Sequence, residues 1–258
     1  MPEPRPEPEP HSLEKRLELD ATVEEVWHAV STGSGLSTWF VPHHVDPQDE
    51  TRSTADFGSG NTSEGRVRAW DPPHRVVFGG EAGNPTETLE FLVESRDGGG
   101  TVLRLVQSGI LGEDWETEYH SRGWDLFFHN LTSYLRYFAP APAVNALAMA
   151  FTELDRKAVW DRFHTALGTS RELSTGESVN LTPDGVEPIR GVVDVYAPDT
   201  TLGIRTDTSM YRFGGHGGEA WGMVNAFHYH YGDERDGPEW TEVWQQWLGR
   251  LFPADPPS

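Results

Sequence analysis

The chain has 258 residues, of which 36% are hydrophobic, with ten Trp and twelve Phe, so it can form one large core or two of ordinary size. It contains no cysteine, which excludes disulfides, thiol nucleophiles and cysteine-based zinc sites. Its 20 Lys and Arg against 41 Asp and Glu give a formal net charge of −21, which disfavours binding to nucleic-acid phosphates and to anionic membranes.

The chain opens with residues 1–11, in which Pro alternates with charged residues, mostly Glu. This alternation blocks helix and ladder formation, and it predicts a disordered tail. No charged and apolar leader is present, and no apolar run approaches the ~18 residues that a membrane span requires. We therefore expect a cytoplasmic protein without a membrane span.

Alternating residues from Leu13 to Leu19 predict a strand with one buried face. Thr22 and Glu25 then have the spacing of a capping box and predict the start of a helix. Gly33 and Gly35 are expected to end that helix. A second short helix is expected over Leu36 to Phe40, ahead of a proline.

Four β-rich segments follow, and we expect them to form an antiparallel meander because strong turn formers separate them. They cover residues 65–70, 75–79, 86–94 and 101–107. Residues 116–138 then place apolar side chains on one helical face, at Trp124, Phe128, Leu131, Leu135 and Phe138. This order of elements predicts an α+β fold in which a long helix lies across a curved antiparallel sheet.

An internal repeat indicates that this unit occurs twice. Residues 146–160 align with 13–27 at an offset of 160 − 27 = 133, and residues 191–204 align with 65–78 at an offset of 191 − 65 = 126. The spacing of apolar residues in the long helix recurs at Trp240, Trp244, Trp247 and Leu251. Three matching segments in the same order favour a duplication. The link 138–144 contains two prolines and is the expected boundary.

The first copy resembles the START-like (SRPBCC) superfamily, and within it the branch homologous to the C-terminal domain of the activator of the heat-shock protein 90 ATPase. The segments that carry the resemblance are Ala21–Ala29, Leu36–Phe40, Gly65–Phe78, Gly99–Ile110 and Gly123–Leu131. The resemblance implies a helix-grip fold, in which a seven-stranded sheet grips the C-terminal helix, often around an apolar cavity. We expect this fold at 12–139 and, in degenerate form, at 145–253, where Glu239 stands in place of Gly123.

If the family geometry holds, the cavity between sheet and helix is lined by residues that are mostly aromatic: Trp39, Phe40, Trp70, Phe91, Trp115, Tyr119, His120, Trp124 and Phe128. The alternative is that the same side chains simply fill the core. Tyr119 and His120 would supply the polar groups that orient a ligand, or else lie on the helix surface.

The leading functional hypothesis is a non-enzymatic binding protein for a hydrophobic small molecule, such as a lipid or an aromatic, polyketide-like compound. The alternative is a polyketide cyclase-like or dehydratase-like enzyme, with His120 and Tyr119 as the polar groups in the cavity. A third is a co-chaperone or other interaction module, although a chaperone partner is not expected to be required.

The sequence contains no obvious nucleophile motif, and we assign no catalytic residue and expect no cofactor. His228 and His230 share one strand face at a spacing that suits a metal, with Asp194 or His216 as conceivable third ligands. A core-edge or solvent-facing role is the stronger expectation for this pair, so no metal site is assigned.

Overall fold

The computed structural model describes residues 11–45, 52–80, 87–110, 114–169, 172–216, 222–232 and 236–253. The expected disordered tail lies outside the described residues except for His11, which begins the first strand. The chain divides into two compact units. The first, here called the first domain, comprises 1–56 and 62–140; the second domain comprises 57–61 and 141–258.

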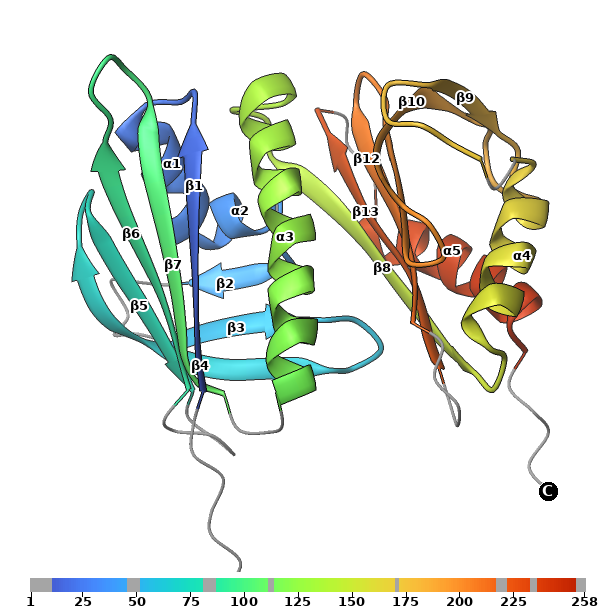
Figure 1. The fold of residues 1–258 in the computed structure, drawn as a ribbon, viewed down its shortest axis with the longest axis horizontal. Coiled ribbons are helices and arrows are strands. Elements are labelled where there is room, and N and C mark those ends of the chain that lie inside the picture. Colours follow the sequence, from blue (N-terminus) through green and yellow to red (C-terminus); the bar gives the residue numbers. More distant parts are fainter. Residues whose placement is uncertain are drawn as a thin grey trace, which may run out of the picture. The chain divides into compact units, whose positions relative to one another are not determined.

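The first domain is a seven-stranded antiparallel sheet with three helices on one side of it (Figure 1). Its elements are β1 (His11–Leu19), α1 (Val23–Ser31), α2 (Gly33–Leu36), β2 (His43–Val45), β3 (Arg52–Asp56), β4 (Thr62–Asp71), β5 (Arg75–Gly80), β6 (Thr88–Ser95), β7 (Thr101–Ile110) and α3 (Asp114–Tyr137). The strand order is β1-β7-β6-β5-β4-β3-β2. This is the predicted α+β helix-grip fold, with the predicted number of strands.

The entry into α1 follows the predicted capping box. The Thr22 hydroxyl accepts a hydrogen bond from the Glu25 amide at 3.2 Å, and the Glu25 carboxylate accepts one from the Thr22 amide at 2.8 Å. Two backbone amides at the start of the helix thereby gain hydrogen-bond acceptors. This fixes the residue at which α1 begins.

Helix α1 ends at Ser31, before Gly33, as expected, but the second short helix was placed wrongly, because α2 runs through Gly33 and Gly35 and ends at Leu36. The glycines are needed there for close packing. A Cβ atom on Gly35 would lie 2.0 Å from the His28 carbonyl oxygen, and one on Gly33 would lie 2.6 Å from the His43 carbonyl oxygen. Residues 37–40, expected to be helical, instead form the turn that carries Trp39 and Phe40 inward.

Two short strands toward one edge of the sheet, β2 and β3, were not predicted. They pair with each other from His43 to Val45 and from Ser53 to Ala55, and β3 continues the sheet onto β4. His43 and His44 belong to β2. Strands this short carry too few residues to show an alternating pattern.

The predicted side chains Trp124, Phe128 and Leu131 of α3 are buried, as is Phe138 directly after the helix, while Leu135 is half-buried. The buried face is wider than predicted because Asn130 is also buried and donates a hydrogen bond to the Trp39 carbonyl at 3.3 Å. Helix α3 is thereby joined both to the sheet and to the turn after α2.

The second domain is a six-stranded antiparallel sheet with two helices packed on one face. Its elements are β8 (Ala143–Thr152), α4 (Arg156–Leu167), β9 (Ser178–Leu181), β10 (Ile189–Ala197), β11 (Thr201–Arg205), β12 (Ser209–His216), β13 (Gly222–Tyr231) and α5 (Gly237–Leu251). The strand order is β8-β13-β12-β11-β10-β9. Trp160, Phe163, Phe213, Trp244 and Trp247 form the centre of its core.

The two domains follow the same plan, with the offsets read from the sequence. Helices α1 and α4 begin at residues 23 and 156, which gives 156 − 23 = 133. The pair Asp71–Arg75 closes the β4–β5 hairpin as Ala197–Thr201 closes the β10–β11 hairpin, and both partners are shifted by 126. The predicted repeat thus corresponds to two copies of the helix-grip arrangement.

None of the described helices is long and apolar enough to cross a membrane.

Candidate functional site

Five of the predicted site residues meet in one aromatic cluster in the first domain. Phe40 stacks on Trp124 with ring centroids 5.2 Å apart, and Phe91 contacts Trp124 at 6.3 Å. Trp39 contacts both Phe91 and Phe128, at 6.2 and 6.3 Å. The turn after α2, the middle of β6 and helix α3 each supply part of this cluster. The cluster therefore forms only when α3 and this turn pack against the sheet.

Two further aromatic residues extend the cluster and were not among the predicted site residues. Phe127 contacts Phe40 edge-on at 4.6 Å, and Phe78 contacts Phe91 at 6.3 Å. Phe78 follows two valines in β5, so its sequence context resembles any core strand. Phe127 could have been found, because it lies one helical turn after Gly123, next to the predicted stripe.

A buried polar chain crosses one side of the cluster. The Trp124 indole N–H donates to Gln107 Oε1 at 2.8 Å, and Gln107 Nε2 donates to Glu87 Oε1 at 2.9 Å. These bonds fix the rotamer of Trp124 and the orientation of its ring, because a buried indole N–H left without an acceptor would cost about 1–3 kcal/mol.

His43 is the polar residue in contact with the cluster that sequence reasoning missed. Its ring lies 5.6 Å from Phe40 and 6.2 Å from Phe78. Its Nδ1 atom is buried and makes no hydrogen bond of acceptable geometry with the described residues. Burial lowers the pKa of His43 to about 4. A hydrogen bond with the Val41 backbone raises the pKa, but by less. The imidazole is therefore neutral near pH 7.

His43 also lines a pocket of about 280 Å³. The other lining residues come from the α2–β2 turn and from β2, β3 and the start of β4: Ser37, Pro42, His44, Thr54, Ala55, Asp56 and Thr62. One imidazole thus touches both the pocket and the rings of the aromatic cluster. The pocket volume falls just below the ~300–1,000 Å³ common for small-molecule sites.

The other predicted site residues do not join this cluster through the described contacts. Trp70 is 37% exposed and packs edge-on against Trp27 at 5.2 Å, on a different part of the domain. Trp115, Tyr119 and His120 belong to the first turns of α3, where the side chains lie outside the described part of the structure. Their predicted roles stay predictions.

In the second domain, the side chains of His228 and His230 enter the core beneath α5. His228 Nδ1 accepts a hydrogen bond from the Arg212 amide at 3.1 Å, and its ring lies 4.3 Å from that of Trp244. Burial lowers the pKa of His228 to about 3; the Phe227 backbone opposes this shift and the Arg212 charge adds to it. Over the described residues, no group of three His, Asp or Glu side chains is placed to hold a metal ion.

Comparison with known proteins finds a family match within the first domain. Residues 20–136 match the family model described as Activator of Hsp90 ATPase homolog 1-like protein. None of the curated proteins matches the chain.

Solved structures resemble either one domain or the whole chain. BH1534 from Bacillus halodurans is 21% identical, covers 48% of this chain and 96% of its own, and superposes with a TM-score of 0.43. DynU16, from the dynemicin biosynthetic locus, is 17% identical over 93% of this chain and 95% of its own, with a TM-score of 0.45. The di-domain ARO/CYC BexL from the BE-7585A biosynthetic pathway is 15% identical over 93% and 94%, with a TM-score of 0.41. The family match, over residues 20–136, lies within the first domain.

Proposed function

We propose that the first domain binds a hydrophobic small molecule, either a lipid or an aromatic compound, without transforming it chemically. The observation that carries the proposal is the position of His43, which lines the pocket and touches the rings of Phe40 and Phe78. A ligand in the pocket therefore needs to displace few side chains to reach the aromatic cluster.

The chemistry of the cluster favours an aromatic or flat apolar ligand. Phe40 is buried and contacts Trp124, Phe127 and His43, whereas Phe127 is only partly buried. Aromatic pairs in offset or edge-on geometry each contribute about 0.5–1.5 kcal/mol beyond area burial, so a ligand ring that replaces one of these contacts recovers much of that energy. Neutral His43 offers one hydrogen-bonding group, which suits a hydroxyl or carbonyl on the ligand.

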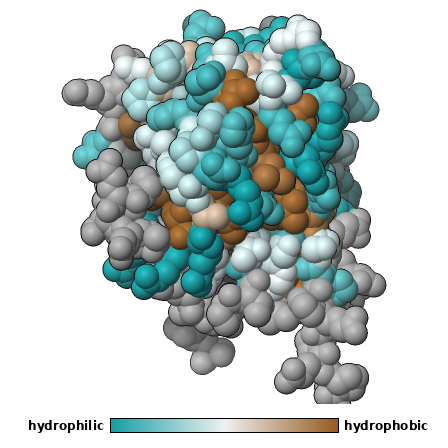
Figure 2. Space-filling model, turned by 90° about the vertical axis from the view of Figure 1, so that its left-hand side faces the viewer, coloured by the Kyte–Doolittle hydropathy of each residue, from teal (hydrophilic) through white to brown (hydrophobic). Residues whose placement is uncertain are grey.

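The surface of the same domain is mixed in character. Figure 2 shows hydrophilic residues over much of one face, with hydrophobic residues between them. Arg104 and Glu14 form one of the ion pairs of the sheet, at 2.8 Å.

The test is calorimetric titration of the full-length protein with a tricyclic aromatic phenol and, separately, with a long-chain fatty acid. Phe40→Ala should weaken binding by about tenfold or more, because it removes the ring nearest the pocket. The matched control is Trp70→Phe, which changes an aromatic residue away from the cluster and should leave the affinity unchanged.

Absence of saturable binding by either compound would overturn the proposal, and so would equal losses in the two variants. Chromatography and mass spectrometry of the recovered ligand decide between binding and catalysis. Recovery of an altered product would favour the cyclase-like alternative.

A further inference from the structure

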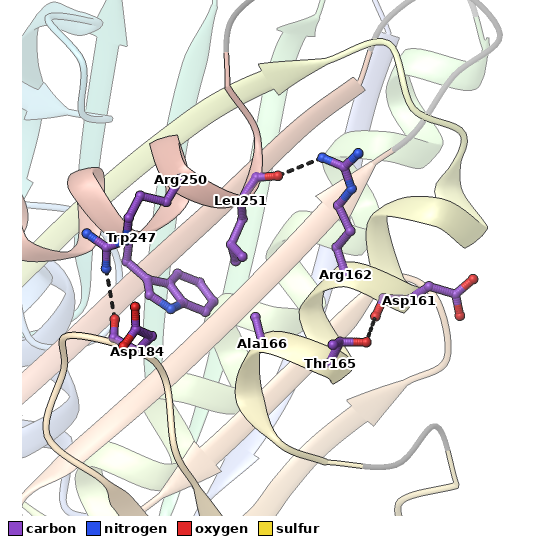
Figure 3. Close-up of a pocket in the computed structure, with 8 residues that line it drawn as sticks. All are labelled: Asp161, Arg162, Thr165, Ala166, Asp184, Trp247, Arg250 and Leu251. Atoms are coloured by element: carbon purple, nitrogen blue, oxygen red, sulfur yellow. Dashed lines mark hydrogen bonds between the residues drawn. The ribbon is translucent and has the colours of Figure 1, made fainter.

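A second pocket, of about 490 Å³, lies in the second domain between α4, α5 and the connection from β9 to β10 (Figure 3). Three apolar side chains, those of Ala166, Trp247 and Leu251, lie in its middle part, with the Trp247 ring beneath Leu251. Charged and polar residues surround them: Asp161, Arg162, Thr165, Asp184 and Arg250. The pocket is thus apolar at its centre and charged around it.

The two arginines come from different walls, and their described hydrogen bonds go to backbone carbonyls. Arg162 of α4 donates to the Leu251 carbonyl oxygen at 2.7 Å, and Arg250 of α5 donates to the Asp184 carbonyl oxygen at 2.8 Å. A guanidinium has five N–H donors, so most of the donors remain available. Arg212 of the same domain, by contrast, binds both carboxylate oxygens of Asp194, at 2.9 and 2.8 Å.

The remaining charges limit what these cations can attract. The Asp161 carboxylate is held by Lys157 at 2.7 Å, whereas the Asp184 carboxylate lies on the pocket itself. Helices α4 and α5 also end beside the pocket, and their C-terminal carbonyls add partial negative charge. The two guanidiniums offset these groups, and the balance suits one negative charge rather than a polyphosphate.

We propose that this pocket binds an amphipathic monocarboxylate, with an aromatic or acyl body. The apolar body of the ligand covers Trp247, Ala166 and Leu251. The carboxylate accepts hydrogen bonds from those N–H groups of Arg162 and Arg250 that do not bind the backbone carbonyls. A guanidinium matches a carboxylate because it offers two parallel donors at once. This pocket is separate from the site proposed in the first domain, although a fatty acid fits the chemistry of both.

The competing explanation is that the arginines only fasten the ends of the helices. The variant Arg250→Lys tests this explanation, because an ammonium can still donate to the Asp184 carbonyl but cannot offer two parallel donors to a carboxylate. The experiment titrates the full-length protein with 2-naphthoate at low ionic strength, with the neutral 2-naphthamide as the comparison ligand. Arg190→Lys is the matched control, since Arg190 lies on β10 of the same domain and is hydrogen-bonded to Asn180.

We expect Arg250→Lys to weaken naphthoate binding by about fivefold or more with an unchanged melting temperature, and Arg190→Lys to have no effect. Asp184→Asn should tighten binding by about two- to fivefold, because it removes a like charge beside the ligand. Phe40→Ala should leave the naphthoate affinity of this pocket unchanged, and any component of binding that this variant removes belongs to the first domain.

Three results would each overturn the proposal: no saturable binding of naphthoate, equal affinity for the neutral amide, or equal effects of the two lysine variants. A drop in melting temperature without a loss of affinity in Arg250→Lys would assign the arginine a structural role only.

Discussion

Replacing His228 with Asn should remove an acid-sensitive component of the stability of the second domain. Asn is a suitable replacement because its side-chain oxygen can accept the hydrogen bond that His228 Nδ1 takes from the Arg212 amide at 3.1 Å. Because Nδ1 is the acceptor, the proton of the neutral ring lies on Nε2, which is buried without a partner among the described residues. Asn has no group that titrates in the acid range.

The size of the effect follows from the pKa. Burial lowers the pKa of His228 to about 3 in the folded protein, from a value of about 6.5 in the unfolded chain. Below about pH 6.5 the unfolded state binds a proton that the folded state does not bind, so the free energy of unfolding falls as the pH falls. Between about pH 7 and about pH 5 this single group should lower it by about 2 kcal/mol.

The assay is urea unfolding followed by tryptophan fluorescence, at about pH 7 and about pH 5, for the wild type and for His228→Asn. The difference in unfolding free energy between the two pH values should be smaller in the variant by about 2 kcal/mol. His28→Asn, at an exposed position of α1, is the control and should behave like the wild type. If His228→Asn keeps the full pH dependence of the wild type, the buried neutral imidazole is not its source.

Three further changes test the packing of each domain by denaturant unfolding. Trp124→Ala should destabilise the first domain by about 3–5 kcal/mol through the cavity it leaves, and a loss below about 1 kcal/mol would show that this ring is not in the core. Gly35→Ala should cost more than about 2 kcal/mol, since its Cβ would meet a carbonyl oxygen at 2.0 Å; a neutral result would mean that α2 lies further from α1. Arg212→Leu should destabilise the second domain by about 3–5 kcal/mol because Asp194 loses both of its guanidinium hydrogen bonds, which an unchanged unfolding midpoint would contradict.

The larger features of the fold could be predicted because each has a strong local pattern. The capping box at Thr22 and Glu25 fixes the start of α1, and the period of apolar residues from Trp124 to Phe138 defines α3. The repeat offsets then identify the second sheet, although α5 has little sequence likeness to α3. These signals depend on local periodicity and spacing, which the sequence displays directly.

The features that were missed depend on contacts across the chain. Gly33 and Gly35 were expected to end a helix, whereas close approach to the backbone at His43 and His28 requires them to lack a side chain. The contact of His43 with Phe78 joins residues that are 35 positions apart, as 78 − 43 shows, and β2 is too short to predict. Likewise, the pocket beside Trp247 depends on how α4, α5 and a loop come together.

Native mass spectrometry of the freshly purified full-length protein tests the central proposal most directly. The wild type should carry a noncovalently bound hydrophobic compound, or should take up in a titration one equivalent of an aromatic phenol, or one equivalent of a fatty acid beyond any that binds in the second domain. Phe40→Ala should lose most of this bound fraction, and Trp70→Phe should keep it. A wild-type spectrum that shows only the bare chain, both as purified and after titration with both compounds, would contradict the proposal that the first domain is a binding site for hydrophobic small molecules.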